Sequence, residues 1–217
     1  ANQAFAAISN VIPWLSDRAW VFGLIMVVGV GIVIIGGIRS IATAAAFIVP
    51  FMCAVYLISS MVVLFVHADK IAAAFGLIFA SAFNLQAGLG GLVGVLMIGF
   101  QRAAFSNEAG IGSAAIAHSA ASTKEPVREG IVALLEPLID TIIICTMTSL
   151  VIIVTGVYDG SNGTGVTMAS GAFATVMPWF PYILAVVVLL FAYSTMLSWS
   201  YYGDRCWAYL FGEKYTT

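Results

Sequence analysis

The sequence predicts an all-α integral membrane protein, and three observations lead to that prediction. Of the 217 residues, 62% are hydrophobic and only 8% are charged, whereas soluble domains carry about 25% charged residues. The mean hydropathy is +1.06. Several apolar stretches also reach the roughly 20 residues that a helix needs to cross a bilayer. With 8 basic and 10 acidic residues, the chain lacks the basic surface of a nucleic-acid-binding protein.

Five apolar stretches are predicted to cross the membrane. They cover about residues 19–36, 41–66, 89–121, 131–157 and 180–203. Pro50 lies inside the second stretch and predicts a kink. The amphipathic residues 70–83 are too short to cross, so we expect them to lie at the membrane interface. We expect all 217 residues to form a single transmembrane transporter domain, in contact with the lipid bilayer along most of its surface.

The basic residues predict an orientation, because they favour the cytoplasmic side of a membrane. In a five-span topology, most of them fall on one set of faces: Arg39, Lys124, Arg128, Arg205 and Lys214. Residues 158–179 hold no Lys or Arg, so we expect this loop on the outer face. The chain starts at Ala1 without a charged leader, so we expect no signal peptide and a piece of a longer protein.

A dense polar cluster interrupts the third stretch at membrane depth. It runs over residues 102–113 and contains Arg102, Ser106, Asn107, Glu108, Gly110, Gly112 and Ser113. Glycine permits backbone angles that other residues avoid, and non-helical backbone inside a membrane is tolerated only where it is buried or lines a cavity. The pattern predicts a helix broken near residues 105–112, as transporters use to bind a substrate. The alternative is a solvated loop at a helix end.

The fourth stretch carries a polar stripe. On a regular α-helix, Asp140, Thr141, Thr148 and Thr155 fall within an arc of about 100°. Hydrogen bonds from the hydroxyls to their own backbone are the favoured interpretation for Thr148 and Thr155. Asp140 is different, because a carboxylate at this depth needs a partner or must be protonated.

The fifth stretch ends in a run of hydroxyl-bearing side chains. On a regular α-helix, Ser194, Thr195, Ser198, Tyr201 and Tyr202 share an arc of about 120°, and hard oxygen ligands suit alkali and alkaline-earth cations. Two alternatives remain, namely the packing of small residues between helices and an aromatic belt at the interface.

The sequence offers little support for a metal enzyme or a hydrolase. The three cysteines form no CxxC pair, and neither His67 nor His118 has a second ligand at metal spacing. Asp140 with His118 is the one pair that would serve an intramembrane enzyme.

The polar cluster resembles the signature of the sodium:alanine (alanine or glycine:cation) symporter family. The resemblance rests on residues 105–113 (FSNEAGIGS) followed by Ala117 and His118. It continues in residues 36–39, 49–52, 140–146 and 194–212 and covers essentially the whole chain. The last two helices of the family and the unwound Gly-Thr-Gly-Asn helix of its first repeat are absent here, so the chain is similar to the middle of a family member.

The resemblance implies part of a LeuT-type inverted-repeat bundle with five transmembrane helices, one of them discontinuous. It also implies sodium-coupled symport of alanine or glycine by alternating access across a bacterial or archaeal cytoplasmic membrane, with no chemical reaction, no cofactor besides the coupling ion and no obligate protein partner. The substrate residues that it implies are Phe105, Ser106, Asn107, Ala109 and Trp199. The sodium ligands are Ser194 and Thr195, and the structural or coupling residues are Arg102, Glu108, Gly110, Gly112 and Asp140.

Two other functions stay open. A proton-coupled carrier of the same fold would use Asp140 or Glu108 as its proton site. An intramembrane enzyme is the more distant alternative.

Overall fold

Three long apolar helices dominate the computed structural model, which describes residues 1–82, 93–94, 96–101, 112–159 and 165–212. They are α3 (Gly37–Val66), the rod Pro126–Thr155 and α11 (Phe180–Phe211). By length and composition each can cross a membrane. The residues that the structure describes form helices and turns and no strand, which confirms the all-α prediction.

The rod is built from several helical segments. It comprises α7 (Pro126–Ala133), α8 (Leu135–Pro137), the π-helix η4 (Leu138–Cys145) and α9 (Thr146–Thr155). Pro137 stands directly before the π-helix, and a proline inside a helix removes one backbone donor and disturbs the preceding turn. The rod ends at Gly156, whose φ of +73° is the left-handed conformation that glycine supplies at helix ends.

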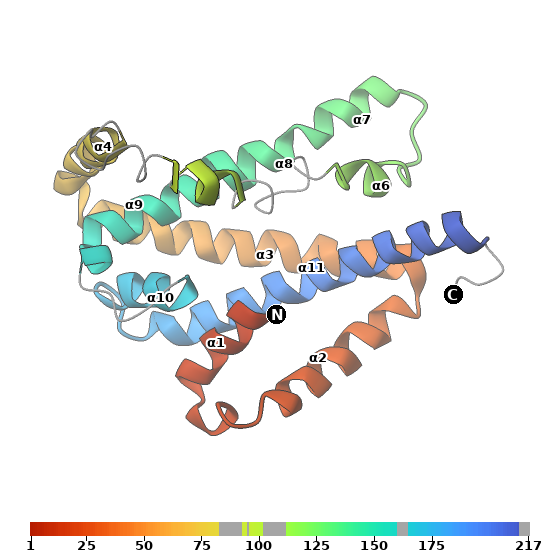
Figure 1. The fold of residues 1–217 in the computed structure, drawn as a ribbon, viewed down its shortest axis with the longest axis horizontal. Helices are drawn as coiled ribbons and strands as arrows, with labels where there is room; N and C mark the ends of the chain where they lie inside the picture. Colours follow the sequence, from red (N-terminus) through yellow and green to blue (C-terminus); the bar gives the residue numbers. More distant parts are fainter. Residues whose placement is uncertain (83–92, 95, 102–111, 160–164, 213–217) are drawn as a thin grey trace.

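Smaller helices surround the long ones. They are α1 (Asn2–Val11), η1 (Pro13–Leu15), α2 (Ala19–Ile34), α4 (Ala68–Ala82), α6 (Ala114–His118), η5 (Val157–Asp159) and α10 (Val166–Ala174). In Figure 1, α4 lies at one end of the molecule and α6 lies near the other, between α7 and α11. The 15 residues of α4 form a separate helix that is too short to cross, in agreement with the prediction for residues 70–83.

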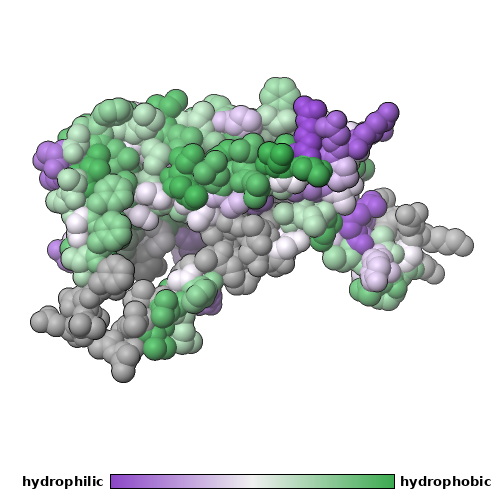
Figure 2. Space-filling model, turned by 90° about the horizontal axis from the view of Figure 1, so that it is seen from above, coloured by the Kyte–Doolittle hydropathy of each residue, from purple (hydrophilic) through white to green (hydrophobic). Residues whose placement is uncertain are grey.

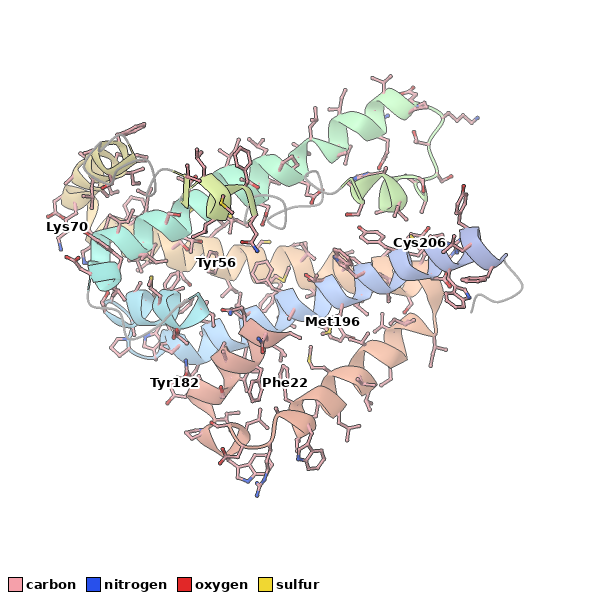
Figure 3. The ribbon with its side chains drawn as sticks, in the orientation of Figure 1. Phe22, Tyr56, Lys70, Tyr182, Met196 and Cys206 are labelled. Carbon is pink, nitrogen blue, oxygen red and sulfur yellow. The ribbon has the colours of Figure 1, made fainter. Side chains whose placement is uncertain are left out.

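The core lies where α3, α9, α10 and α11 meet. Phe173 of α10 and Val151 of α9 are fully buried there, beside Phe180 and Leu184 of α11. Tyr56 of α3 points into the same core, and its ring meets that of Phe173 edge-on at 5.7 Å. A second cluster joins Phe22 and Met26 of α2 to α1 and to Met196 of α11, and Figure 3 shows how these side chains lie. In Figure 2, hydrophobic residues cover much of the face seen and hydrophilic residues gather at one end.

The helices differ from the predicted spans at several ends. α3 begins at Gly37 rather than near 41, the rod begins at Pro126 rather than near 131, and α11 continues to Phe211 rather than ending near 203. The reason is that the hydropathy falls where charged residues begin, whereas the hydrogen bonds within the helix continue past Asp204 and Arg205. α10 was not predicted at all, because residues 158–179 were interpreted as a loop.

The predicted number of five crossings is only partly matched. α2 has 16 residues, fewer than a crossing usually needs, and much of the third predicted span lies outside the described residues. The predicted orientation in the membrane stays a prediction. Figure 1 shows the start of α3, α7 and the carboxyl end of α11 at the same end of the bundle.

Candidate functional site

The third predicted span does not continue as one helix through Gly112. Residues 96–101 are helical, and α6 begins again at Ala114. Gly112 lies between them with a φ of +82°, and a right-handed helix cannot pass through a residue in that conformation. The predicted break near residues 105–112 lies almost entirely outside the described residues and stays a prediction, to which Gly112 adds a helix end on its carboxyl side. Seven predicted site residues lie outside the described part of the chain: Arg102, Phe105, Ser106, Asn107, Glu108, Ala109 and Gly110.

Ser113 follows Gly112, and the environment of its hydroxyl group is unusual. Its hydroxyl oxygen is buried and makes no hydrogen bond to the residues that the structure describes. Buried polar groups almost always have a partner, so a solitary hydroxyl needs an explanation. Ser113 belongs to the predicted polar cluster, but no sequence pattern indicates that its oxygen lacks a partner among the described residues.

The predicted sodium ligands are consecutive residues of α11. Ser194 and Thr195 each donate a hydrogen bond to the carbonyl oxygen of Phe191, at 3.0 and 2.9 Å. Because each hydroxyl has a single hydrogen, both donors are used and both oxygens keep lone pairs for another partner. α6 packs against α11, so the short helix that follows Gly112 contacts the helix of the predicted sodium ligands.

Trp199 lies one turn after Thr195 on α11. Its side chain is 48% exposed, and its ring lies 6.2 Å from that of the buried Tyr202. Thr195 is exposed as well, so one face of α11 carries both predicted residues and is left uncovered by the residues that the structure describes.

Asp140 lies inside the π-helix η4 and is partly buried. This π-helix has a wider turn than an α-helix, so the regular spacing assumed for the arc of Asp140, Thr141, Thr148 and Thr155 applies only after Cys145, and the arc stays a prediction. Thr148 and Thr155 donate to the carbonyls of Ile144 and Val151, as the favoured interpretation of these hydroxyls predicted.

The proposed catalytic pair of Asp140 and His118 is wrong. Nδ1 of His118 lies 2.6 Å from Oε1 of Glu129. Asp140 lies 11 residues further along the rod, or about 16 Å at the helical rise. His118 therefore has a different carboxylate partner. Among the described residues, no three His, Cys, Asp or Glu side chains gather in a way that could hold a metal ion.

Sequence reasoning missed two residues that make polar contacts between helices. Tyr56 hydrogen-bonds Thr148 from a long apolar stretch, and Glu129, the partner of His118, was not among the predicted residues. No sequence pattern marks either residue. Tyr56 and Thr148 lie 92 residues apart, and His118 and Glu129 meet across a turn whose geometry cannot be predicted from the sequence.

Comparison with known proteins gives a consistent result. The sodium:alanine symporter family matches residues 1–217. The chain is 43% identical over 196 residues to the sodium/alanine symporter AgcS of Methanococcus maripaludis, covering 88% of this chain and 43% of that protein. It is 35% identical to the putative sodium/proton-dependent alanine carrier protein YrbD of Bacillus subtilis, covering 97% of this chain and 46% of that protein.

A third relative carries the name of another amino acid. The chain is 33% identical to the probable sodium/glutamine symporter GlnT of Bacillus subtilis, covering 84% of this chain and 38% of that protein. The chain thus spans less than half the length of these three relatives.

Proposed function

Because this chain belongs to the sodium:alanine symporter family, we propose that it forms part of a carrier that takes up alanine or glycine with sodium. It is a multi-pass protein of the cell membrane. We propose a LeuT-type bundle that works by alternating access, in which the third span is a discontinuous helix. The remaining helices of the complete carrier would supply the other half of the binding site.

The interruption at Gly112 is the observation that carries this proposal. Where a helix breaks at membrane depth, the freed amide and carbonyl groups need partners. An amino acid zwitterion offers them, since its carboxylate accepts from N–H groups and its ammonium donates to carbonyl oxygens. The substrate would be bound by Phe105, Ser106, Asn107 and Ala109. Arg102, Glu108 and Gly110 would hold the broken helix in shape, because a buried charge requires a partner.

Sodium would bind at Ser194 and Thr195. Both hydroxyls give their hydrogens to the carbonyl of Phe191 and therefore present oxygen lone pairs, which are the ligands that a hard cation prefers. Carbonyl oxygens from the rest of the carrier would complete the site. Sodium drives uptake if it stabilises the substrate-binding conformation more than the alternative one.

Trp199 would limit the size of the substrate. A large ring beside the pocket excludes longer side chains by steric overlap. Trp199→Ala should admit larger amino acids, such as glutamine, in competition with labelled alanine. A preference for alanine that survives this change would instead assign Trp199 to the interfacial aromatic belt.

The decisive experiment is the uptake of labelled alanine by the complete carrier in proteoliposomes. Uptake should require an inward sodium gradient and should saturate with alanine. Asn107→Ala should abolish it. Normal alanine affinity in that variant would put the pocket elsewhere, and uptake that ignores sodium would contradict the coupling. Recovery of alanine in a chemically altered form would point to an enzyme instead of a carrier.

A proton-coupled carrier of the same fold is the second candidate, and it is supported by the similarity to YrbD, a putative sodium/proton-dependent alanine carrier protein. Asp140 or Glu108 would then bind the coupling proton. Uptake measured at fixed sodium across a pH series separates the two. A proton gradient that drives uptake without sodium would favour this second candidate.

A further inference from the structure

A hydrogen bond closes the turn between α6 and α7. Nδ1 of His118 lies 2.6 Å from Oε1 of Glu129, and the two side chains are 29% and 26% exposed. A carboxylate accepts and does not donate, so Nδ1 carries the hydrogen and Glu129 receives it. His118 is the last residue of α6 and Glu129 lies in the first turn of α7. A carboxylate suits that position because of the helix dipole.

Among the described residues, the His118–Glu129 bond is the only hydrogen bond or ion pair between the side chains of α6 and α7. An open groove of about 520 Å³ separates them, and its walls are mostly small side chains such as Ala114, Ala115, Gly130 and Ala133. Small residues allow close approach of helices but do not fix how one helix is rotated or shifted along the other. The His118–Glu129 bond supplies that constraint.

α6 also lies at a junction of the fold. It follows the interruption at Gly112, it packs against α11, and through His118 it is tied to the rod that begins with α7 (Figure 1). Five residues are too few for a helix to hold its position by its own hydrogen bonds. The position of α6 therefore depends on its contacts with α7 and α11.

We propose that His118 and Glu129 are positioning residues of the carrier, and we call the pair the His118–Glu129 clasp. The clasp fixes α6 against α7, so that the backbone entering α6 at Gly112 is held in its binding geometry and moves together with the rod. The pair does not touch the substrate. This inference rests on the proposed function and adds to it the residues that order the carboxyl half of the broken span.

The test measures alanine uptake by the complete carrier in proteoliposomes at saturating sodium. Glu129→Ala should raise the KM for alanine about three- to tenfold, the effect of losing one hydrogen bond. The maximal rate per carrier molecule should stay within about twofold. A folding defect would lower the maximal rate and leave KM unchanged. Glu129→Gln keeps an accepting oxygen and should restore a KM close to that of the unmodified carrier.

Glu125→Ala is the matched control. It removes the same charge four residues earlier, and Glu125 is exposed and makes no side-chain capping bond. Its KM should equal that of the unmodified carrier. The proposal is overturned if Glu129→Ala leaves KM unchanged, if Glu129→Gln is as impaired as Glu129→Ala, or if the control raises KM equally.

A second measurement does not depend on transport. In a variant without Cys53, Cys145 and Cys206, cysteines placed at positions 118 and 129 should be joined by a short thiol-reactive crosslinker. Cysteines at 118 and 127 should be joined far less efficiently, because Val127 is 78% exposed and residues two apart on a helix do not share a face. If the first pair does not crosslink, the clasp is wrong. If the unmodified carrier transports no alanine while the first pair crosslinks, the proposed function fails and the geometry of the clasp stands.

Discussion

The hydroxyl of Tyr56 on α3 lies 2.6 Å from the hydroxyl of Thr148 on α9. Thr148 also lies 2.7 Å from the carbonyl oxygen of Ile144, inside the π-helix. A carbonyl can only accept, so the single hydrogen of Thr148 goes to Ile144 and Tyr56 must donate to Thr148. The two bonds form a directed chain from α3 into the π-helix that contains Asp140.

This direction predicts an asymmetry between two substitutions. Tyr56→Phe removes the donor but leaves Thr148 bonded to Ile144, and should lower the free energy of unfolding by about 0.5–1.5 kcal/mol. Thr148→Val leaves the Tyr56 hydroxyl buried without an acceptor, and should lower it by about 1–3 kcal/mol. Reversible denaturation in mixed micelles measures both values.

The double variant provides the control for this asymmetry. With both hydroxyls removed, no buried donor is left unpaired, so the double variant should be less destabilised than the sum of the two single changes. Equal effects of the single changes, with strict additivity, would mean that the two hydroxyls do not interact in the folded protein.

Phe173 tests whether α10 is part of the core. Its side chain is fully buried and its ring lies 4.7 Å from that of Phe180. Phe173→Ala should lower the free energy of unfolding by about 3–5 kcal/mol, because it leaves a cavity. Phe47→Ala is the comparison, since Phe47 is 78% exposed, and it should change stability by less than about 0.5 kcal/mol. If both variants lose the same free energy of unfolding, α10 is not part of the core.

The missed α10 shows where sequence reasoning stopped. Composition and hydropathy predicted the all-α class and the long spans, because burial in lipid depends on the average character of about 20 residues. The segment 166–174 is short and follows a glycine-rich sequence, and its burial depends on contacts with α3, α9 and α11 that the local sequence does not encode. For the same reason the sequence predicted the hydroxyl stripe of Ser194 and Thr195 but not their shared acceptor on Phe191.

The π-helix shows a second limit. The stripe of Asp140 and Thr148 was predicted with regular helical spacing, and one widened turn after Pro137 is enough to rotate Asp140 relative to Thr148. Local sequence marks the proline but does not say whether the helix kinks, breaks or widens. The His118–Glu129 clasp has the same character, since it requires the geometry of the turn between α6 and α7.

The assignment of Ser194 and Thr195 as sodium ligands predicts a change in the sodium dependence of uptake when both are replaced. Ser194→Ala combined with Thr195→Ala removes two oxygen ligands and should raise the sodium concentration for half-maximal uptake by about tenfold or more, since a tenfold change corresponds to about 1.4 kcal/mol. Ser200→Ala is the matched control, because Ser200 donates to a carbonyl of the same helix in the same way. Unchanged sodium activation in the double variant would exclude both residues as ligands.

Replacement of Ser113 by alanine should have opposite effects on stability and on alanine binding. Its buried hydroxyl has no partner in the described part of the chain, so Ser113→Ala removes an unsatisfied group. The free energy of unfolding without substrate should stay the same or rise by up to about 1 kcal/mol. If the hydroxyl is kept for the bound amino acid, the same change should raise the KM for alanine about tenfold. Ser119→Ala is the control, since that hydroxyl is exposed and bonds its own helix, and it should alter neither quantity. A Ser113→Ala variant that is destabilised and yet binds alanine normally would show that the hydroxyl serves the fold rather than the substrate.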